Sequence, residues 1–117
     1  MKTKIDEILE LKLESPEDYE TLNNYVRKIP FFRDREHITH ELLEKFIDKV
    51  ARKYPVMISS IMPCHLKNEI LWYSVPLKRT DTQECIKIIS ASTLYEALAK
   101  SAIYLYAYTR KYFRSET

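Results

Sequence analysis

The fold is decided within residues 84–96, whose sequence is Glu84-Cys85-Ile86-Lys87-Ile88-Ile89-Ser90-Ala91-Ser92-Thr93-Leu94-Tyr95-Glu96. Residues 84–90 are rich in β-branched side chains and predict a strand. Thr93 is followed three residues later by Glu96, a capping-box pattern that predicts the start of a helix. An apolar stripe carries this helix to residue 113: Leu94, Leu98, Ala102, Leu105, Tyr108 and Tyr112. A strand therefore leads directly into the last helix.

Two more strands are predicted upstream, at residues 56–62 and at residues 69–75, the second ending near Pro76. Cys64-His65 lies in the predicted turn after the first of them. The polar residues 78–82 predict the turn before the third strand, which is longer than the two-residue hairpin loops that usually require glycine.

Helices are predicted on the N-terminal side of these strands. Thr39 caps a helix over residues 39–54, whose apolar stripe and charged opposite face end at Pro55. Ser15 and Pro16 begin an earlier helix, which Pro30 stops. Residues 3–14 leave two alternatives open, a helix capped by Thr3 or a strand over residues 9–14, where apolar and polar residues alternate.

The predicted fold class is α+β, a two-layer sandwich in which N-terminal helices precede an α-β-β-β-α unit. Its small antiparallel sheet buries one face under the helices at residues 40–54 and 93–113. The chain of 117 residues has the length of a single domain. We expect residues 1–38 to form an N-terminal helical extension and residues 39–114 to form the core.

The composition is most informative in what it lacks, because none of the 117 residues is glycine. Average usage of about 7% predicts roughly 8. A glycine-rich phosphate loop, a dinucleotide-binding turn and a glycine-flanked nucleophile elbow are thereby excluded. The net charge is +2, but residues 1–20 carry −4 and the remaining residues +6, so an acidic head precedes a mildly basic body.

The sequence is typical of a cytoplasmic protein. Its two cysteines, Cys64 and Cys85, do not form a disulfide framework, and reduced thiols are expected. The first residues lack the apolar core of a signal peptide, and no apolar run approaches the roughly 20 residues of a membrane span.

Candidate chemical sites are weak. A zinc site could combine His37, His40, Cys64 and His65, but their spacing matches no standard finger. Cys64 could act as a nucleophile with one of these histidines as base, yet the neighbouring sequence does not supply the helix N-terminus or cationic neighbours that activate a catalytic thiol. Carboxylate pairs such as Glu36 and Glu41 fall on exposed helical positions. We therefore predict no catalytic residue, no metal and no cofactor.

Two surfaces are better candidates for binding. The last helix is apolar all round and rich in aromatic residues, which predicts contact with a protein partner or with a second copy in a homodimer. The residues predicted to make this contact are Tyr95, Tyr104, Tyr106, Tyr108 and Tyr112. The alternative is nucleic-acid binding by basic residues interleaved with aromatic ones, and its candidates are Lys78, Arg79, Arg110, Lys111 and Arg114.

The order of elements in residues 39–113 resembles a double-stranded-RNA-binding domain. That family has a lysine-rich start to its last helix and a loop with glycine, whereas this helix begins Thr93-Leu94-Tyr95-Glu96-Ala97-Leu98. The departures fall on the RNA-contacting positions of the family, so RNA binding by that route is not expected.

A second resemblance covers about a third of the chain. The segment from Ile70-Leu71-Trp72-Tyr73 to Ala91-Ser92-Thr93-Leu94-Tyr95-Glu96-Ala97-Leu98-Ala99-Lys100-Ser101-Ala102 resembles small phage and prophage proteins of the αβ-sandwich type. The resemblance implies a phage or mobile-element accessory protein without catalytic residues. Our prediction is a protein-binding module that inhibits or regulates a protein partner.

Overall fold

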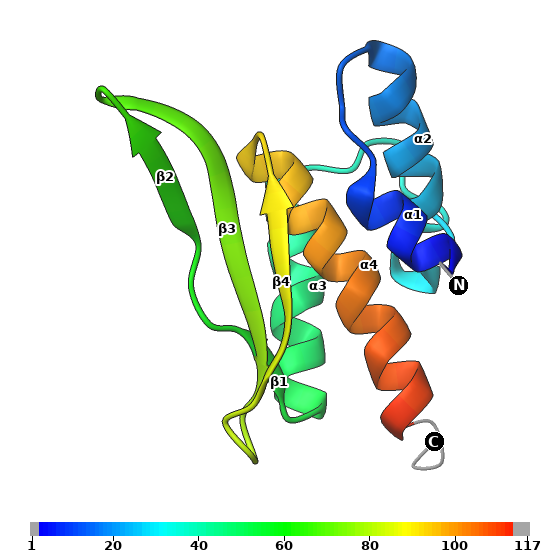
Figure 1. The fold of residues 1–117 in the computed structure, drawn as a ribbon. Coiled ribbons are helices and arrows are strands. Elements are labelled where there is room, and N and C mark those ends of the chain that lie inside the picture. The colour runs from blue at the N-terminus through cyan, green and yellow to red at the C-terminus, as the bar shows by residue number, and fades with distance from the viewer. Residues whose placement is uncertain (1–2, 114–117) are drawn as a thin grey trace.

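The computed structural model describes residues 3–113, which form helices on one side of an antiparallel sheet (Figure 1). The α+β class predicted from the sequence is confirmed. The helical elements are α1 (Lys4–Glu10), α2 (Pro16–Val26), the 3-10 helix η1 (Pro30–Phe32), α3 (His40–Lys53) and α4 (Leu94–Phe113). The strands are β1 (Val56–Ile58), β2 (Met62–Leu66), β3 (Glu69–Arg79) and β4 (Cys85–Ala91).

Strand β3 is the centre of the sheet. It pairs with β4 along one side, while β1 and β2 share its other side, and every pairing is antiparallel. The predicted strand over residues 56–62 is therefore wrong as a single element, because β1 ends at Ile58 and β2 starts at Met62.

Proline at position 76 explains this break. The prediction that the second strand ends near Pro76 is wrong, since β3 continues to Arg79. Proline has no N–H to donate to a ladder, so the segment on the side of β3 that the Pro76 backbone faces loses one ladder hydrogen bond there. The Pro76 carbonyl still accepts a hydrogen bond from the Ser59 N–H at 2.9 Å, where the chain crosses from β1 to β2.

The turn between β2 and β3 contains only Lys67 and Asn68. Both residues have positive φ, 52° and 69° respectively, as a tight two-residue hairpin requires. Asparagine tolerates this left-handed region better than most residues do. Lys67 adopts it at a position where glycine would fit with less steric cost. Cys64 and His65, expected in a turn, instead lie within β2.

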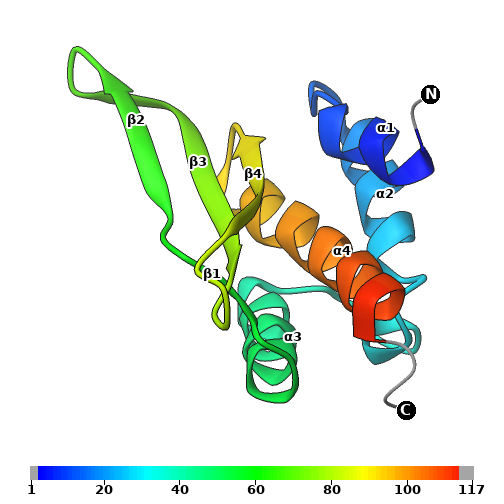
Figure 2. The same ribbon diagram turned by 60° about the horizontal axis from the view of Figure 1, so that its bottom comes forward.

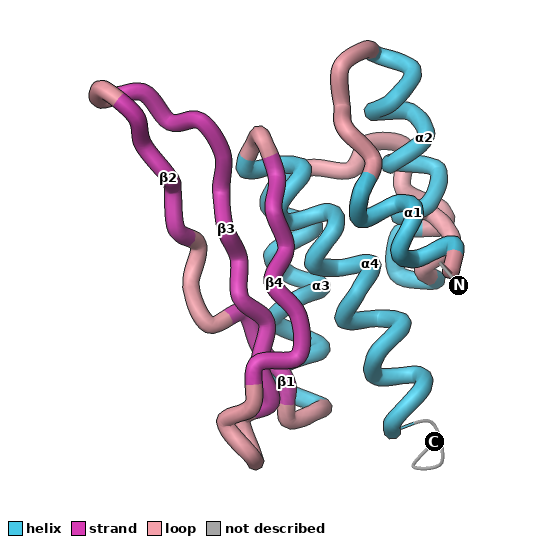
Figure 3. Tube along the Cα trace, viewed as in Figure 1, coloured by secondary structure: helices cyan, strands magenta, loops and turns pink. Residues whose placement is uncertain are grey.

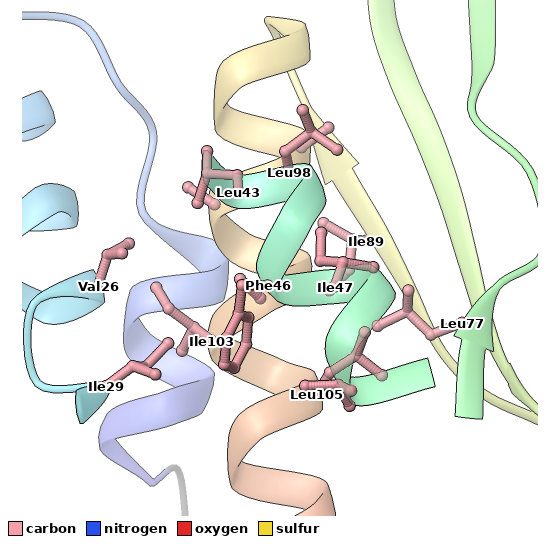
Figure 4. Packing of buried hydrophobic residues seen from close by; sticks show 14 of the residues in the cluster. Val26, Ile29, Leu43, Phe46, Ile47, Leu77, Ile89, Leu98, Ile103 and Leu105 are labelled. Carbon is pink, nitrogen blue, oxygen red and sulfur yellow. The ribbon is translucent and has the colours of Figure 1, made fainter. Parts of the chain in front are cut away.

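The core lies between the sheet and the helices α3 and α4 (Figure 4). Leu43 and Phe46 of α3 pack beside Leu98 and Ile103 of α4 (Figure 4). From the sheet, Val75, Leu77 and Ile89 are buried against these helices. Burial of each such side chain contributes about 1.5–3 kcal/mol, so this layer contact contributes strongly to stability.

The N-terminal helices cover another side of α4 (Figure 2). Each has a reciprocal capping box, between Thr3 and Asp6 in α1 and between Ser15 and Asp18 in α2. The two alternatives for residues 3–14 are thus resolved as helix α1 followed by a non-helical link. Leu22 and Val26 of α2 are fully buried, so this extension is packed on the core.

Candidate protein-interaction surface

Strands β2 and β3 form a hairpin that extends beyond the end of β4 (Figure 3). We call residues 61–72 of this hairpin the arm. Strand β4 pairs with β3 only from Tyr73 onward, so residues 69–72 pair with β2 alone. The ladder of the arm shifts register between Cys64 and His65.

The arm carries most of the exposed large hydrophobic side chains among the described residues. Among the described residues, eight large hydrophobic side chains are exposed, and six of them belong to the arm: Ile61, Met62, Leu66, Ile70, Leu71 and Trp72. Leu66, next to the turn, is 58% exposed and Trp72 is 45% exposed. Contiguous exposed apolar side chains mark interaction sites more often than scattered ones do.

Within residues 3–113, no helix lies against one face of the sheet (Figures 1 and 2). Val75 and Ile89 are a register pair buried on the helix side, so the next pair, Pro76 and Ile88, points to the opposite face. Ile88 is 57% exposed. Trp72 of the arm lies on this same open face, because it is four residues from Pro76 along β3.

Two of the tyrosines predicted to contact a partner, Tyr95 and Tyr104, are held by other parts of the chain. Tyr95 is half-buried, and its hydroxyl donates to the Asn23 side-chain oxygen at 2.5 Å. The Tyr104 hydroxyl donates to the Ile86 carbonyl at 3.3 Å. Burial raises the pKa of both phenols. These two side chains are structural contacts between α4 and its neighbours.

The remaining tyrosines lie along the second half of α4. The Tyr106 hydroxyl accepts a hydrogen bond from Arg110 at 2.5 Å. The rings of Tyr108 and Tyr112 are 4.4 Å apart, and only Tyr112, 53% exposed, presents most of its side chain to solvent. The apolar character of α4 on all sides is thus largely used for packing within the chain.

The basic residues near the β3–β4 turn make local contacts. Arg79 forms an ion pair with Asp81 at 2.6 Å, which lowers the pKa of that carboxyl, and its guanidinium lies 5.0 Å from the Phe113 ring centre. The Lys78 ammonium donates to the Gln83 side chain at 3.0 Å. The charge of Arg79 is therefore partly neutralised, and Lys78 already has a hydrogen-bond partner.

The basic residues at the end of α4 stack on aromatic rings. Lys111 lies 5.4 Å from the ring centre of Tyr112, and Arg110 lies 5.3 Å from that of Tyr106. Arg114 lies outside the described residues.

The candidate metal ligands are not assembled into a site. Residues 3–113 contain no group of three or more His, Cys, Asp or Glu side chains placed to hold a metal ion. His37 is exposed beside Glu36, while the His40 ring packs 5.6 Å from that of Tyr95. Both cysteines are free thiols, Cys64 half-buried and Cys85 exposed.

A buried charged pair was missed by the sequence analysis. Lys100 and Glu96 are only 2% and 3% exposed, and the Lys100 ammonium lies 2.6 Å from the Glu96 carboxylate. The same ammonium donates to the Leu11 carbonyl at 2.8 Å, and Glu96 accepts two hydrogen bonds from Ser92. The i,i+4 spacing of Glu96 and Lys100 is visible in the sequence. Their burial depends on the distant link after α1, which no local pattern reveals.

The fold and the exposed surface together define a small α+β protein with an apolar hairpin arm. Comparisons with protein-family models, curated proteins and solved structures find no match to this chain. Within residues 3–113, no helix has the length and apolar character needed to cross a membrane.

Proposed function

We propose that this chain is a non-catalytic protein-binding module and that the arm is its contact surface. The observation that carries the proposal is the concentration of six of the eight exposed large hydrophobic side chains in residues 61–72. A tryptophan among aliphatic side chains and a methionine suits the centre of a protein interface, where aromatic residues and methionine are enriched.

The proposal moves the expected contact away from the tyrosines of α4. Four of these five tyrosines are half-buried within the chain, and Tyr112 is the exposed exception. The resemblance to phage accessory proteins adds the prediction that the partner is a protein which this chain inhibits or regulates. The alternative is nucleic-acid binding by the basic residues near the β3–β4 turn and the end of α4, and the experiment must distinguish this from binding of a protein partner.

The test compares three forms of the full chain as bait for proteins in a cell extract. They are the wild type, the arm variant Leu66→Ser/Ile70→Ser and the control Tyr112→Ser. Leu66 and Tyr112 have similar exposed fractions, 58% and 53%, so the control removes an exposed apolar group of comparable accessibility elsewhere. We expect a stoichiometric partner that wild type and control retain and that the arm variant loses.

Loss of the partner with Tyr112→Ser but not with the arm variant would return the contact to α4. Recovery of nucleic acid by all three forms would support the basic residues instead.

A further inference from the structure

The outer edge of β4 has unpaired backbone groups, and the register identifies them. The Pro76 carbonyl bonds to Ser59, on the β1–β2 side of β3, so the backbone of Pro76 points away from β4. Its register partner Ile88 therefore directs its own N–H and C=O outward, away from β3. Two residues on, the pair Ser74 and Ser90 repeats this arrangement, so the backbone N–H and C=O of Ser90 also point outward.

No hydrogen bond outside the ladder involves the backbone of Ile88 or Ser90 within residues 3–113. Ile88 is 57% exposed and Ser90 is also exposed. An edge with this arrangement is a template for one more strand. The opposite edge of the sheet is different, because β2 carries Pro63 opposite Tyr73. The backbone N–H and C=O of Tyr73 point toward β4, so the backbone of Pro63 faces outward from β2. Proline has no N–H to offer at this position, which weakens strand addition there.

A groove of about 880 Å³ runs beside the outer edge of β4. Its walls are residues 87–92 on one side and residues 9–14 on the other, and the buried pair of Glu96 and Lys100 lies at its base. The apolar side chains of Leu71 and Trp72 continue the lining into the arm. The groove is thus open to the unpaired backbone of β4 and continuous with the proposed contact surface.

The charges around this groove favour a neutral occupant. Its lining contains three cations and three carboxylates, which are Lys12, Lys87, Lys100, Glu10, Glu14 and Glu96. A polyanion such as nucleic acid would meet the carboxylates, and a strongly basic tail would meet the lysines. Outward N–H and C=O groups at alternate residues are complementary to extended backbone.

We propose that the groove binds an extended segment of the partner protein, which adds to β4 as an edge strand between β4 and residues 9–14. The segment has little net charge and alternates apolar with polar side chains, with one set directed to the open face beside Ile88. The wall formed by residues 9–14 favours a single strand over the sheet edge of a second copy, which carries an identical wall. This inference rests on the proposed function and specifies how the partner is held.

The probe is a displayed library of short random linear peptides, selected on the immobilised full chain. Enriched peptides are then measured against wild type, Ile88→Pro and the control Ile88→Val. Proline at this position removes an outward N–H and leaves the ladder groups of Ile89 in place. We expect Ile88→Pro to weaken peptide binding about tenfold and Ile88→Val to leave it nearly unchanged. Equal binding of the peptides by all three forms would overturn the proposal.

Amide hydrogen exchange of the wild type keeps the test decisive if Ile88→Pro does not fold. The Ile88 and Ser90 amides should exchange rapidly in the free chain and slowly with an enriched peptide bound, while Ile89 is slow in both. Rapid exchange at Ile88 and Ser90 in the bound form would contradict strand addition. The proposal would also be contradicted if the Ile88 and Ser90 amides exchanged slowly in concentrated samples without peptide, because a second copy of the chain would then occupy the edge.

The failure of this inference is distinguishable from failure of the proposed function. A captured partner that Leu66→Ser/Ile70→Ser loses and Ile88→Pro retains would overturn strand addition and leave the arm as the contact surface. A partner retained by both variants would overturn both proposals.

Discussion

Lys100 is the residue whose environment departs furthest from what its type prefers. Lysine is almost never fully buried unless it is paired, and here its ammonium is held by Glu96 and by the Leu11 carbonyl. It joins α4 to the link between α1 and α2, a sequence separation of 89 residues. The pair therefore positions the wall of the groove as well as satisfying its own charges.

Replacing Lys100 by methionine should destabilise the fold strongly. The substitution preserves much of the side-chain volume but leaves the Glu96 carboxylate buried without its cation, and removal of one partner of a buried pair typically costs about 3–5 kcal/mol. The free energy of unfolding from urea titration measures the effect. The double variant Glu96→Gln/Lys100→Met should recover part of the loss, and a single-variant loss below about 1 kcal/mol would show that the pair is dispensable.

Tyr95 makes the stability of the fold depend on pH. Burial raises the pKa of its phenol above the ordinary value of 10.0. The unfolded chain then loses this proton more readily than the folded chain, so the contribution to stability is complete below the ordinary pKa and is lost as pH rises through the raised one. Subtracting the ultraviolet absorbance titration curve of Tyr95→Phe from that of the wild type should isolate a phenol that ionises above pH 10.0. A difference curve with its midpoint at or below that value would contradict the assignment.

At the scale of elements, the hairpin turn is built without the residue that best suits it. Lys67 has φ of 52°, a conformation in which a side chain with a Cβ atom costs about 1–2 kcal/mol. Lys67→Gly should therefore stabilise the hairpin by up to about 1 kcal/mol, measured by thermal or urea unfolding and by slower amide exchange in β2. Lys67→Ala keeps the Cβ atom and should bring no such gain. Equal effects of glycine and alanine would mean that backbone strain at Lys67 is unimportant.

The sequence predicted the helices better than the strands, for a physical reason. Caps and apolar stripes are local signals, and Thr39, Ser15 and the segment after Thr93 place three helices within a few residues of their observed bounds. A strand depends on its neighbour. The break between β1 and β2 is set by Pro76, a residue in another strand, so no pattern within residues 56–62 predicts it.

At the scale of the whole molecule, residues 3–38 complete the core. Leu22, Val26 and Phe32 have no exposed surface, and α2 packs against α4. A chain lacking residues 1–38 should expose the covered side of α4 and aggregate or lose its fixed packing, which size-exclusion chromatography and NMR dispersion would detect. The full chain is the control. A truncated chain with sharp, dispersed NMR signals would show that the extension is a separate addition.

The candidate surface could be predicted only in part. The sequence indicated a protein-binding role from aromatic richness, but it located that role on α4, where four of the five tyrosines are half-buried. Trp72 and Ile70 lie in an apolar run that is typical of a buried strand. They are exposed because the arm extends beyond β4, which stops at Ala91 opposite Tyr73, and because no helix within residues 3–113 covers the open face on which Trp72 lies. Such a difference in strand length is a property of the assembled sheet.

The most direct test of the arm as a protein-binding surface is light scattering behind a size-exclusion column. The full chain is run alone and with a captured partner at low and at high salt, alongside the variant Leu66→Ser/Ile70→Ser. We predict a complex of protein alone whose mass persists at high salt, because apolar contacts are not screened, and which the variant fails to form. A particle that contains nucleic acid at low salt, releases it at high salt and is unaffected by the variant would show that the arm is not the binding surface.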